Sequence, residues 1–138
     1  MIEHPGIDRL YRSWSDAFAR KDVDAIFALL TDDYTLWMPG APPVDREALR
    51  PRLATALAAY DLTPRFECLD RIVSGDIACD IGWDVQDARP HAEGGAAGAA
   101  MSQRQRVCLV LRRGGDNVWR FARGVSQPVP DVAVIPSG

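Results

Sequence analysis

Side chains that could carry out acid–base chemistry are few in this chain, and they lie far apart in the sequence. Proton transfer needs a group that can hold or release a proton beside the reacting atom. Three side chains are weak candidates for this catalytic role: Tyr34, Tyr60 and His91. The second histidine, His4, lies near the N-terminus, far from His91. The sequence therefore favours weak acid–base assistance over a dedicated catalytic pair.

Polar side chains interrupt the apolar faces of two expected strands near the C-terminus. Gln103 and Gln105 lie on one of these faces, and Arg123 lies on the other. A buried arginine needs an anionic or hydrogen-bonding partner. For Arg123 this partner could be a ligand carboxylate or phenolate, or a structural acid such as Asp33. The two glutamines could contact a ligand, or water could satisfy them at the start of their strand.

Two acids and two arginines lie on neighbouring expected strands. Asp80 and Asp84 belong to the first strand, and Arg104 and Arg106 belong to the next. Alternation along the first strand places both acids on the face opposite Trp83. This pattern is typical of an outward ladder of cross-strand ion pairs. A buried relay of acids and arginines is the alternative, and it would require the opposite face to be the interior.

The three cysteines, Cys68, Cys79 and Cys108, are odd in number and lie within apolar strand patterns. No CxxC or HxxxH spacing accompanies them, so we expect no metal site and no cofactor. Buried free thiols in a reducing cytosol explain them best. The first residues, Met1–Gly6, have neither a basic start nor an apolar core, so a cytoplasmic protein is expected.

Length and composition are those of one soluble globular domain. The 138 residues fit a single domain over residues 1–138, with a surface tail at residues 128–138 that contains three prolines. The formal net charge of −3 and the pI of about 5.3 argue against a nucleic-acid partner. No apolar run approaches the roughly 18 residues that cross a bilayer, so no membrane partner is expected.

The hydrophobic spacing changes along the chain from a helical period to a strand period. It predicts a helix over residues 7–20, a second helix capped by Asp22, a strand over residues 34–38 and a third helix capped by Asp45. An acidic turn at residues 32–33 ends the second helix.

After Thr63 the period becomes two, which predicts four strands, over residues 64–73, 77–86, 101–113 and 118–127. On the first of these, Phe66, Cys68 and Ile72 share a face. The order α-α-β-α-β-β-β-β indicates the α+β class.

Three segments carry a family resemblance: KDVDAIFALLTDDYTLWMPG at Lys21–Gly40, the helix opening at Asp45, and WRFARGVS at Trp119–Ser126. With residues 11–20 they resemble the nuclear transport factor 2-like superfamily, which includes SnoaL-like cyclases and ketosteroid isomerases. The resemblance implies a cone-shaped α+β barrel, in which three helices pack on a strongly curved, mainly antiparallel sheet. It also implies a hydrophobic pocket and a homodimer.

The same resemblance argues against ketosteroid isomerase chemistry. Met38 stands where that enzyme has its general-base aspartate, Trp14 where it has the oxyanion-hole tyrosine, and Val107 where it has a second acid. Methionine cannot act as a base, and proton abstraction beside a carbonyl needs one. The sequence leaves open whether the protein is an enzyme at all.

Most residues that the pattern turns inward are apolar or amphipathic, as in pockets for small ligands. Apart from Tyr34, we expect ligand contacts from Trp14, Phe18, Met38, Tyr60, Phe66, Trp83, Gln103, Gln105, Phe121 and Arg123. Three of these aromatic side chains, Trp14, Phe18 and Trp83, could instead simply fill the core.

Two functions compete. The first is a small-molecule pocket protein of the SnoaL-like type, which binds an apolar or aromatic ligand and has isomerase-, cyclase- or lyase-like chemistry. The alternative is a non-enzymatic dimeric binding or assembly module that uses the outer face of its sheet.

Overall fold

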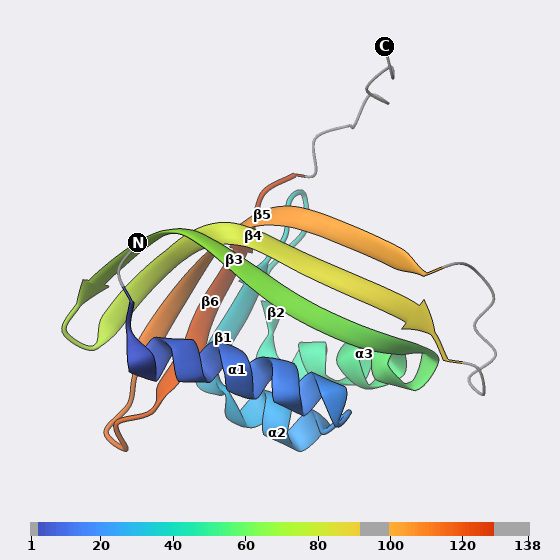
Figure 1. The fold of residues 1–138 in the computed structure, drawn as a ribbon, viewed down its shortest axis with the longest axis horizontal. Coiled ribbons are helices and arrows are strands. Elements are labelled where there is room, and N and C mark those ends of the chain that lie inside the picture. Colours follow the sequence, from blue (N-terminus) through green and yellow to red (C-terminus); the bar gives the residue numbers. More distant parts are fainter. Residues whose placement is uncertain (1–2, 92–99, 129–138) are drawn as a thin grey trace, which may run out of the picture.

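A bent six-stranded sheet arches over three helices, which lie together on its concave side (Figure 1). The computed structural model describes residues 3–91 and 100–128. The elements are α1 (Pro5–Ala19), α2 (Val23–Ala28), β1 (Leu30–Trp37), β2 (Val44–Asp45), α3 (Arg46–Ala59), β3 (Tyr60–Ser74), β4 (Ile77–Pro90), β5 (Met101–Arg113) and β6 (Trp119–Ser126). The predicted α+β class is confirmed. Except for Pro128, the expected surface tail lies outside the described residues.

The sheet is mixed and does not close into a barrel. Its strand order is β2-β1-β6-β5-β4-β3, so β2 and β3 form the two edges. The strands from β3 to β6 pair antiparallel, whereas β1 runs parallel to β6. No helix within the described residues is long and apolar enough to cross a membrane.

Local signals set the start of each helix. The His4 side chain accepts a hydrogen bond from the Ile7 backbone nitrogen at 3.3 Å and caps α1, which has proline in its first turn. Asp22 caps α2 and Asp45 caps α3, as predicted. The second helix is shorter than expected, because β1 already begins at Leu30 and includes the residues expected to form the acidic turn.

The core lies between the helices and the concave face of the sheet. Its fully buried apolar side chains come from α1, α2 and β5: Ile7, Ile26, Phe27 and Leu111. Burying such side chains stabilises the fold by about 1.5–3 kcal/mol each. The helices therefore form one wall of the interior and the sheet forms the other.

A bulge in β3 changes which residues face the interior. Cys68 pairs with Gly82 and Asp70 pairs with Ile81, so Leu69 is an extra residue that has no partner. Beyond the bulge, Arg71 turns toward the core and Ile72 turns outward, with 63% of its surface exposed. The expectation that Ile72 shares a face with Phe66 is wrong for this reason.

The interior face of β4 is also the opposite of the predicted one. Asp80 is fully buried, while Trp83 lies on the convex face beneath Arg104 and Arg106, whose guanidinium carbons are 4.5 and 4.2 Å from the ring centroid. The expected outward ladder of Asp80 and Asp84 with these arginines is therefore wrong. Stacked guanidinium groups allow the indole to lie outside the core.

Buried polar groups attach α1 to the sheet. Arg71 donates two hydrogen bonds to the Asp80 carboxylate, at 2.8 and 3.0 Å, and one to Asp8 at 3.1 Å. The Tyr11 hydroxyl donates to Asp80 at 2.7 Å. Burial, followed by the negative charge of Asp80, raises the pKa of Tyr11. The Tyr11 hydroxyl is thus held as a structural donor.

Candidate functional site

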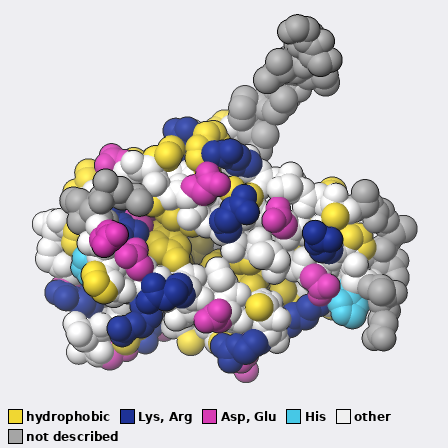
Figure 2. Space-filling view, in the orientation of Figure 1, with side chains coloured by type: hydrophobic (Ala, Val, Ile, Leu, Met, Phe, Trp, Pro, Cys, Tyr) yellow, Lys and Arg dark blue, Asp and Glu magenta, His cyan; other side chains and the backbone are white. Residues whose placement is uncertain are grey.

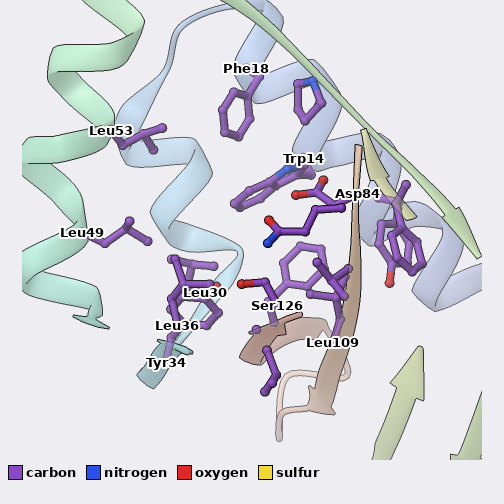
Figure 3. A pocket seen from close by; sticks show the side chains of 18 of the residues that line it. Trp14, Phe18, Leu30, Tyr34, Leu36, Leu49, Leu53, Asp84, Leu109 and Ser126 are labelled. Atoms are coloured by element: carbon purple, nitrogen blue, oxygen red, sulfur yellow. The ribbon is translucent and has the colours of Figure 1, made fainter. Parts of the chain in front are cut away.

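A cavity of about 290 Å³ lies between α1, α3 and the concave face of the sheet. Its walls are mainly apolar, with aromatic side chains from α1 and the strands and leucines from α3 (Figure 3). Figure 2 shows hydrophobic side chains in a hollow near the middle of the view, with charged side chains around it. The volume is near the lower end of the range for small-molecule sites, which begins at about 300 Å³.

Aromatic side chains contact one another along one wall. Tyr11 stacks on Phe66 with their rings 5.0 Å apart and 7° from parallel. Trp14 meets Phe121 edge to face at 5.1 Å and lies 4.9 Å from Phe18. These contacts fix the ring orientations, so the wall offers a stable apolar surface.

Asp84 brings a carboxyl group into this apolar space (Figure 3). Its partners in the ladder are Phe66 on β3 and Gln105 on β5. No described residue donates a hydrogen bond to the carboxyl group or forms an ion pair with it. Solvent reaches the side chain through the cavity, but the apolar walls desolvate it, and this raises the pKa of Asp84.

Tyr34, on β1, is a second polar side chain of the cavity, and its hydroxyl has no hydrogen-bond partner among the described residues. Its side chain is almost completely buried, and its hydroxyl lies against the backbone of Gly124 on β6. Burial, followed by the negative charge of Asp84, raises the pKa of Tyr34 to about 12. The phenol is therefore protonated at neutral pH and can donate a hydrogen bond.

Further polar side chains line the cavity and have partners elsewhere. Ser15 donates to the backbone oxygen of Pro64, and Arg65 lies 3.8 Å from Glu67. Gln105 donates one hydrogen bond to the backbone oxygen of Gln127 at 2.6 Å, and Ser126 donates to the backbone oxygen of Trp37 at 3.3 Å. Gln105 and Ser126 keep oxygen atoms that can accept hydrogen bonds from a ligand.

Many of the residues expected at the site do meet in the cavity. It is lined by seven of them: Trp14, Phe18, Tyr34, Met38, Phe66, Gln105 and Phe121. That these side chains contact a ligand stays a prediction. Val107, which stands where ketosteroid isomerase has its second acid, also lines the cavity.

The remaining expected residues lie elsewhere. Trp83 is on the convex face, and Gln103 is exposed on β5. Tyr60 starts β3, where its backbone oxygen accepts a hydrogen bond from Lys21 at 3.4 Å. His91 follows β4, with its backbone nitrogen bonded to the Ala59 oxygen at 2.9 Å. Neither Tyr60 nor His91 lines the cavity.

Arg123 contacts a structural acid. Its guanidinium group donates to the Asp33 backbone oxygen at 2.9 Å and lies 3.7 Å from the Asp33 carboxylate. The expectation of an inward arginine is wrong because β6 contains a bulge. Phe121 pairs with Leu111 and Arg123 pairs with Val110, so Ala122 is an extra residue that changes the face of Arg123.

Asp84 was missed as a functional residue. Alternation puts Ala78 and the following even-numbered residues on one side of β4 but does not say which side is the inner one. Gly82, on the same side as Asp84, is the signal in the sequence, because a glycine within a strand marks a bulge or a close approach of another backbone. A Cβ atom at this position would lie 2.1 Å from the Glu67 backbone oxygen. Only glycine fits there.

Metal chemistry finds no support in the described side chains. Among residues 3–91 and 100–128, no group of three or more histidine, cysteine and acidic side chains is arranged to hold a metal ion.

Comparisons with known proteins agree on one fold. A family model described as the SnoaL-like domain matches residues 11–121. A conserved protein from Planctomyces limnophilus superposes with a TM-score of 0.77 at 18% identity, over 88% of this chain and 91% of that one. No curated protein sequence matches significantly.

Two other solved structures carry functional descriptions. A ketosteroid isomerase-like protein from Erwinia carotovora atroseptica has a TM-score of 0.65 at 21% identity, over 88% of this chain and 92% of that one. A candidate dehydratase of the nuclear transport factor 2-like family from Streptomyces avermitilis has a TM-score of 0.70 at 18% identity, over 91% and 95%. At these identities the similarity shows the fold alone.

Proposed function

The chain belongs to the SnoaL-like domain family of the nuclear transport factor 2-like superfamily, and from this premise we propose that its cavity binds a small apolar or aromatic molecule on which Asp84 moves a proton. The observation that carries the proposal is the Asp84 carboxyl group, which has no partner among the described residues and lies in an apolar cavity. Desolvated acids of this kind cluster at functional sites.

The raised pKa suits a group that both takes and returns a proton. Catalytic acids and bases work best when their pKa lies near the operating pH, and desolvation moves Asp84 in this direction. A carboxylate at this position would remove a proton from a ligand carbon beside a carbonyl group and return it at another atom. An isomerase moves a proton in this way without a net gain or loss of protons. Cyclases and lyases can begin with the same removal of a proton.

Tyr34 is the group best suited to assist. Its protonated hydroxyl can donate a hydrogen bond to the ligand oxygen on which negative charge develops. Gln105 and Ser126 accept hydrogen bonds and orient the ligand. The positions where ketosteroid isomerase has its catalytic residues also line the cavity, as Trp14, Met38 and Val107. Asp84 would therefore serve as a base from a different strand position.

A bicyclic ketone provides the test. 2-Tetralone is smaller than the cavity and has an acidic proton beside its carbonyl group. Its hydrogen–deuterium exchange in D₂O, measured by NMR, reports proton transfer directly. We expect the protein to accelerate exchange and Asp84→Asn to lower this acceleration by about 100-fold or more.

Asp87→Asn is the matched control, because Asp87 lies on the same strand but on the opposite face. The Asp87→Asn variant should accelerate the exchange of 2-tetralone as much as the parent protein does. If Asp84→Asn also accelerates it as much as the parent protein, Asp84 has no acid–base role. Unchanged melting temperatures with 2-tetralone and with 2-naphthol would refute the pocket role, because a bound ligand raises the melting temperature.

A second candidate, an assembly module, is favoured by the convex face. Ile72 and Ile77 are diagonal neighbours there and are 63% and 53% exposed. Contiguous exposed apolar patches often mark interaction surfaces. We propose that a second copy of the chain covers them. Light scattering should then give a dimer mass that Ile72→Glu reduces to the monomer, whereas a monomeric parent protein would exclude this function.

A further inference from the structure

Two cysteine side chains face each other on the convex side of the sheet. Cys79 lies on β4 and Cys108 lies on β5, and their Sγ atoms are 3.1 Å apart. In the ladder Cys79 is opposite Val110 and Cys108 is opposite Ile81, so the two cysteines are diagonal neighbours. Both are free thiols. They lie on the face opposite Asp84 and the cavity.

Both thiols are partly exposed, whereas the sequence predicts buried free thiols. The third cysteine, Cys68, is also partly exposed, but it belongs to β3 and its Sγ atom lies 3.5 Å from the Asp70 backbone oxygen. It is opposite Gly82 in the ladder and therefore on the concave face. The chain thus has one close thiol pair and one separate thiol.

We propose that Cys79 and Cys108 are a dithiol site that small disulfides, such as oxidised glutathione, convert reversibly to an intrachain disulfide. An S–S bond is about 2.0 Å long, so the sulfur atoms need to approach by only about 1 Å. Because the two residues are diagonal neighbours, the movement combines side-chain rotation with a small shift of the two strands. The site is independent of the cavity and of any ligand that binds there.

The reaction balances in two exchange steps. One cysteine thiolate attacks a sulfur atom of oxidised glutathione, forms a mixed disulfide and releases one glutathione thiolate. The other cysteine then loses its proton and attacks the protein sulfur of the mixed disulfide, which releases the second glutathione. The protein loses two protons and two electrons, and oxidised glutathione takes up both electrons to give two molecules of reduced glutathione.

The environment of the two thiols determines the rate of this oxidation. Burial, followed by the hydrogen bond and the charge of Cys108, raises the pKa of Cys79 to about 11. The thiolate is the reactive form, so oxidation is slow at neutral pH and becomes faster as the pH rises. The pair therefore differs from a catalytic redox centre, in which a thiolate is present at neutral pH.

The bond would join two strands that also carry the candidate site. Asp84 and Gln105 are ladder partners on the other face of β4 and β5, which lie side by side in Figure 1. A disulfide restrains the unfolded chain and stabilises the native state. Oxidation therefore should tighten the strand pair that forms one wall of the cavity.

The experiment is oxidation of the reduced full-length protein by oxidised glutathione, at low protein concentration and at several pH values. We expect a mass loss of two hydrogens, the disappearance of two of the three titratable thiols, and a Cys79–Cys108 peptide after digestion without reduction. The rate should rise with pH. The melting temperature should rise by about 5 °C or more and return to its first value after reduction.

Single serine variants provide the controls. Cys68→Ser should give the same disulfide, whereas Cys79→Ser and Cys108→Ser should give none. Melting curves of the reduced variants show that each one is folded. A stable glutathione adduct on Cys79 or Cys108 in the parent protein, a disulfide that includes Cys68, or three thiols that react at equal rates would each overturn the proposal.

Discussion

The Tyr34 hydroxyl oxygen lies 2.9 Å from the point at which a Cβ atom on residue 124 would stand. Gly124 is therefore the residue that allows the phenol to lie against β6 and to face the cavity. The backbone of Gly124 does not require glycine, because it has no positive φ angle. The glycine makes space for Tyr34, so the two residues act together at the site.

Gly124→Ala should displace Tyr34 and narrow the cavity. Overpacking of this kind costs about 1–3 kcal/mol, which chemical denaturation would measure. Binding of 2-naphthol should weaken at the same time. Gly115→Ala is the control, since no atom lies within 4 Å of its new Cβ atom. If Gly124→Ala has the same free energy of unfolding and the same affinity for 2-naphthol as the parent protein, the position of the Tyr34 phenol does not depend on this glycine.

Asp84→Asn should increase stability at neutral pH and change its pH dependence. The pKa of Asp84 in the folded protein is raised above the ordinary value of 3.8, so the unfolded chain loses this proton at a lower pH than the folded chain does. The parent protein should therefore lose stability as the pH rises from 3.8 to the folded-state pKa.

The asparagine variant should not show this loss. The difference between the two free energies of unfolding should grow over that pH window and then remain constant. We expect a gain of about 1 kcal/mol or less for the variant, because solvent still reaches the side chain. A parent protein whose stability relative to Asp84→Asn increases over the same window would contradict a raised pKa.

The cavity should prefer neutral ligands to anionic ones. Asp84 lies inside it, whereas Arg123 is bonded to Asp33. Arg65 contributes to the wall, but its side chain is 60% exposed and lies 3.8 Å from Glu67. We expect 2-naphthoate to bind at least about tenfold more weakly than 2-naphthol in calorimetry, a difference of about 1.4 kcal/mol.

The same measurement with Asp84→Asn tests the cause of this preference. Removal of the carboxylate should reduce the difference between the two ligands, and Asp87→Asn should preserve it. Equal binding of both ligands by the parent protein would show that Asp84 does not select for charge. Binding of neither ligand would instead count against the cavity as a ligand site.

Asp80→Asn should be strongly destabilising. Asp80 is fully buried and accepts hydrogen bonds from Arg71 and Tyr11, so the substitution removes the buried negative charge that faces the Arg71 guanidinium group and leaves the half-exposed Asp8 carboxylate in contact with it. The expected loss in denaturant unfolding is about 3–5 kcal/mol. Asp76→Asn is the control. The ion pair between Asp76 and Arg113 is short, 2.7 Å, but exposed. Asp76→Asn should therefore lower the free energy of unfolding by less than about 1 kcal/mol. Similar losses for both variants would contradict the structural role of Asp80.

The sequence was sufficient for features that are set locally. Asp22 and Asp45 were recognised as helix caps because the capping bond joins residues three apart. The α+β class followed from the change of hydrophobic period, and the family resemblance was confirmed. The pairing of β1 with β6 joins distant segments, and no local pattern predicts it.

The faces of the strands could not be predicted as reliably. Alternation assigns a face only if every residue has a partner, and the extra residues Leu69 and Ala122 break this condition. Ile72 and Arg123, which follow these bulges, were therefore assigned to the wrong face. On β4 the apolar set that includes Trp83 lies outside because two arginines cover the indole. This is why Asp84 was placed outside the site.

The parallel pairing of β1 with β6 also determines when the protein can fold during its synthesis. β6 begins 82 residues after β1 ends, and the other neighbour of β1 is the two-residue strand β2. The ribosome therefore releases the first strand long before the strand that completes its hydrogen bonds. Until β6 emerges, β1 lacks its parallel partner, whereas β3, β4 and β5 can already pair with one another because they follow each other along the chain.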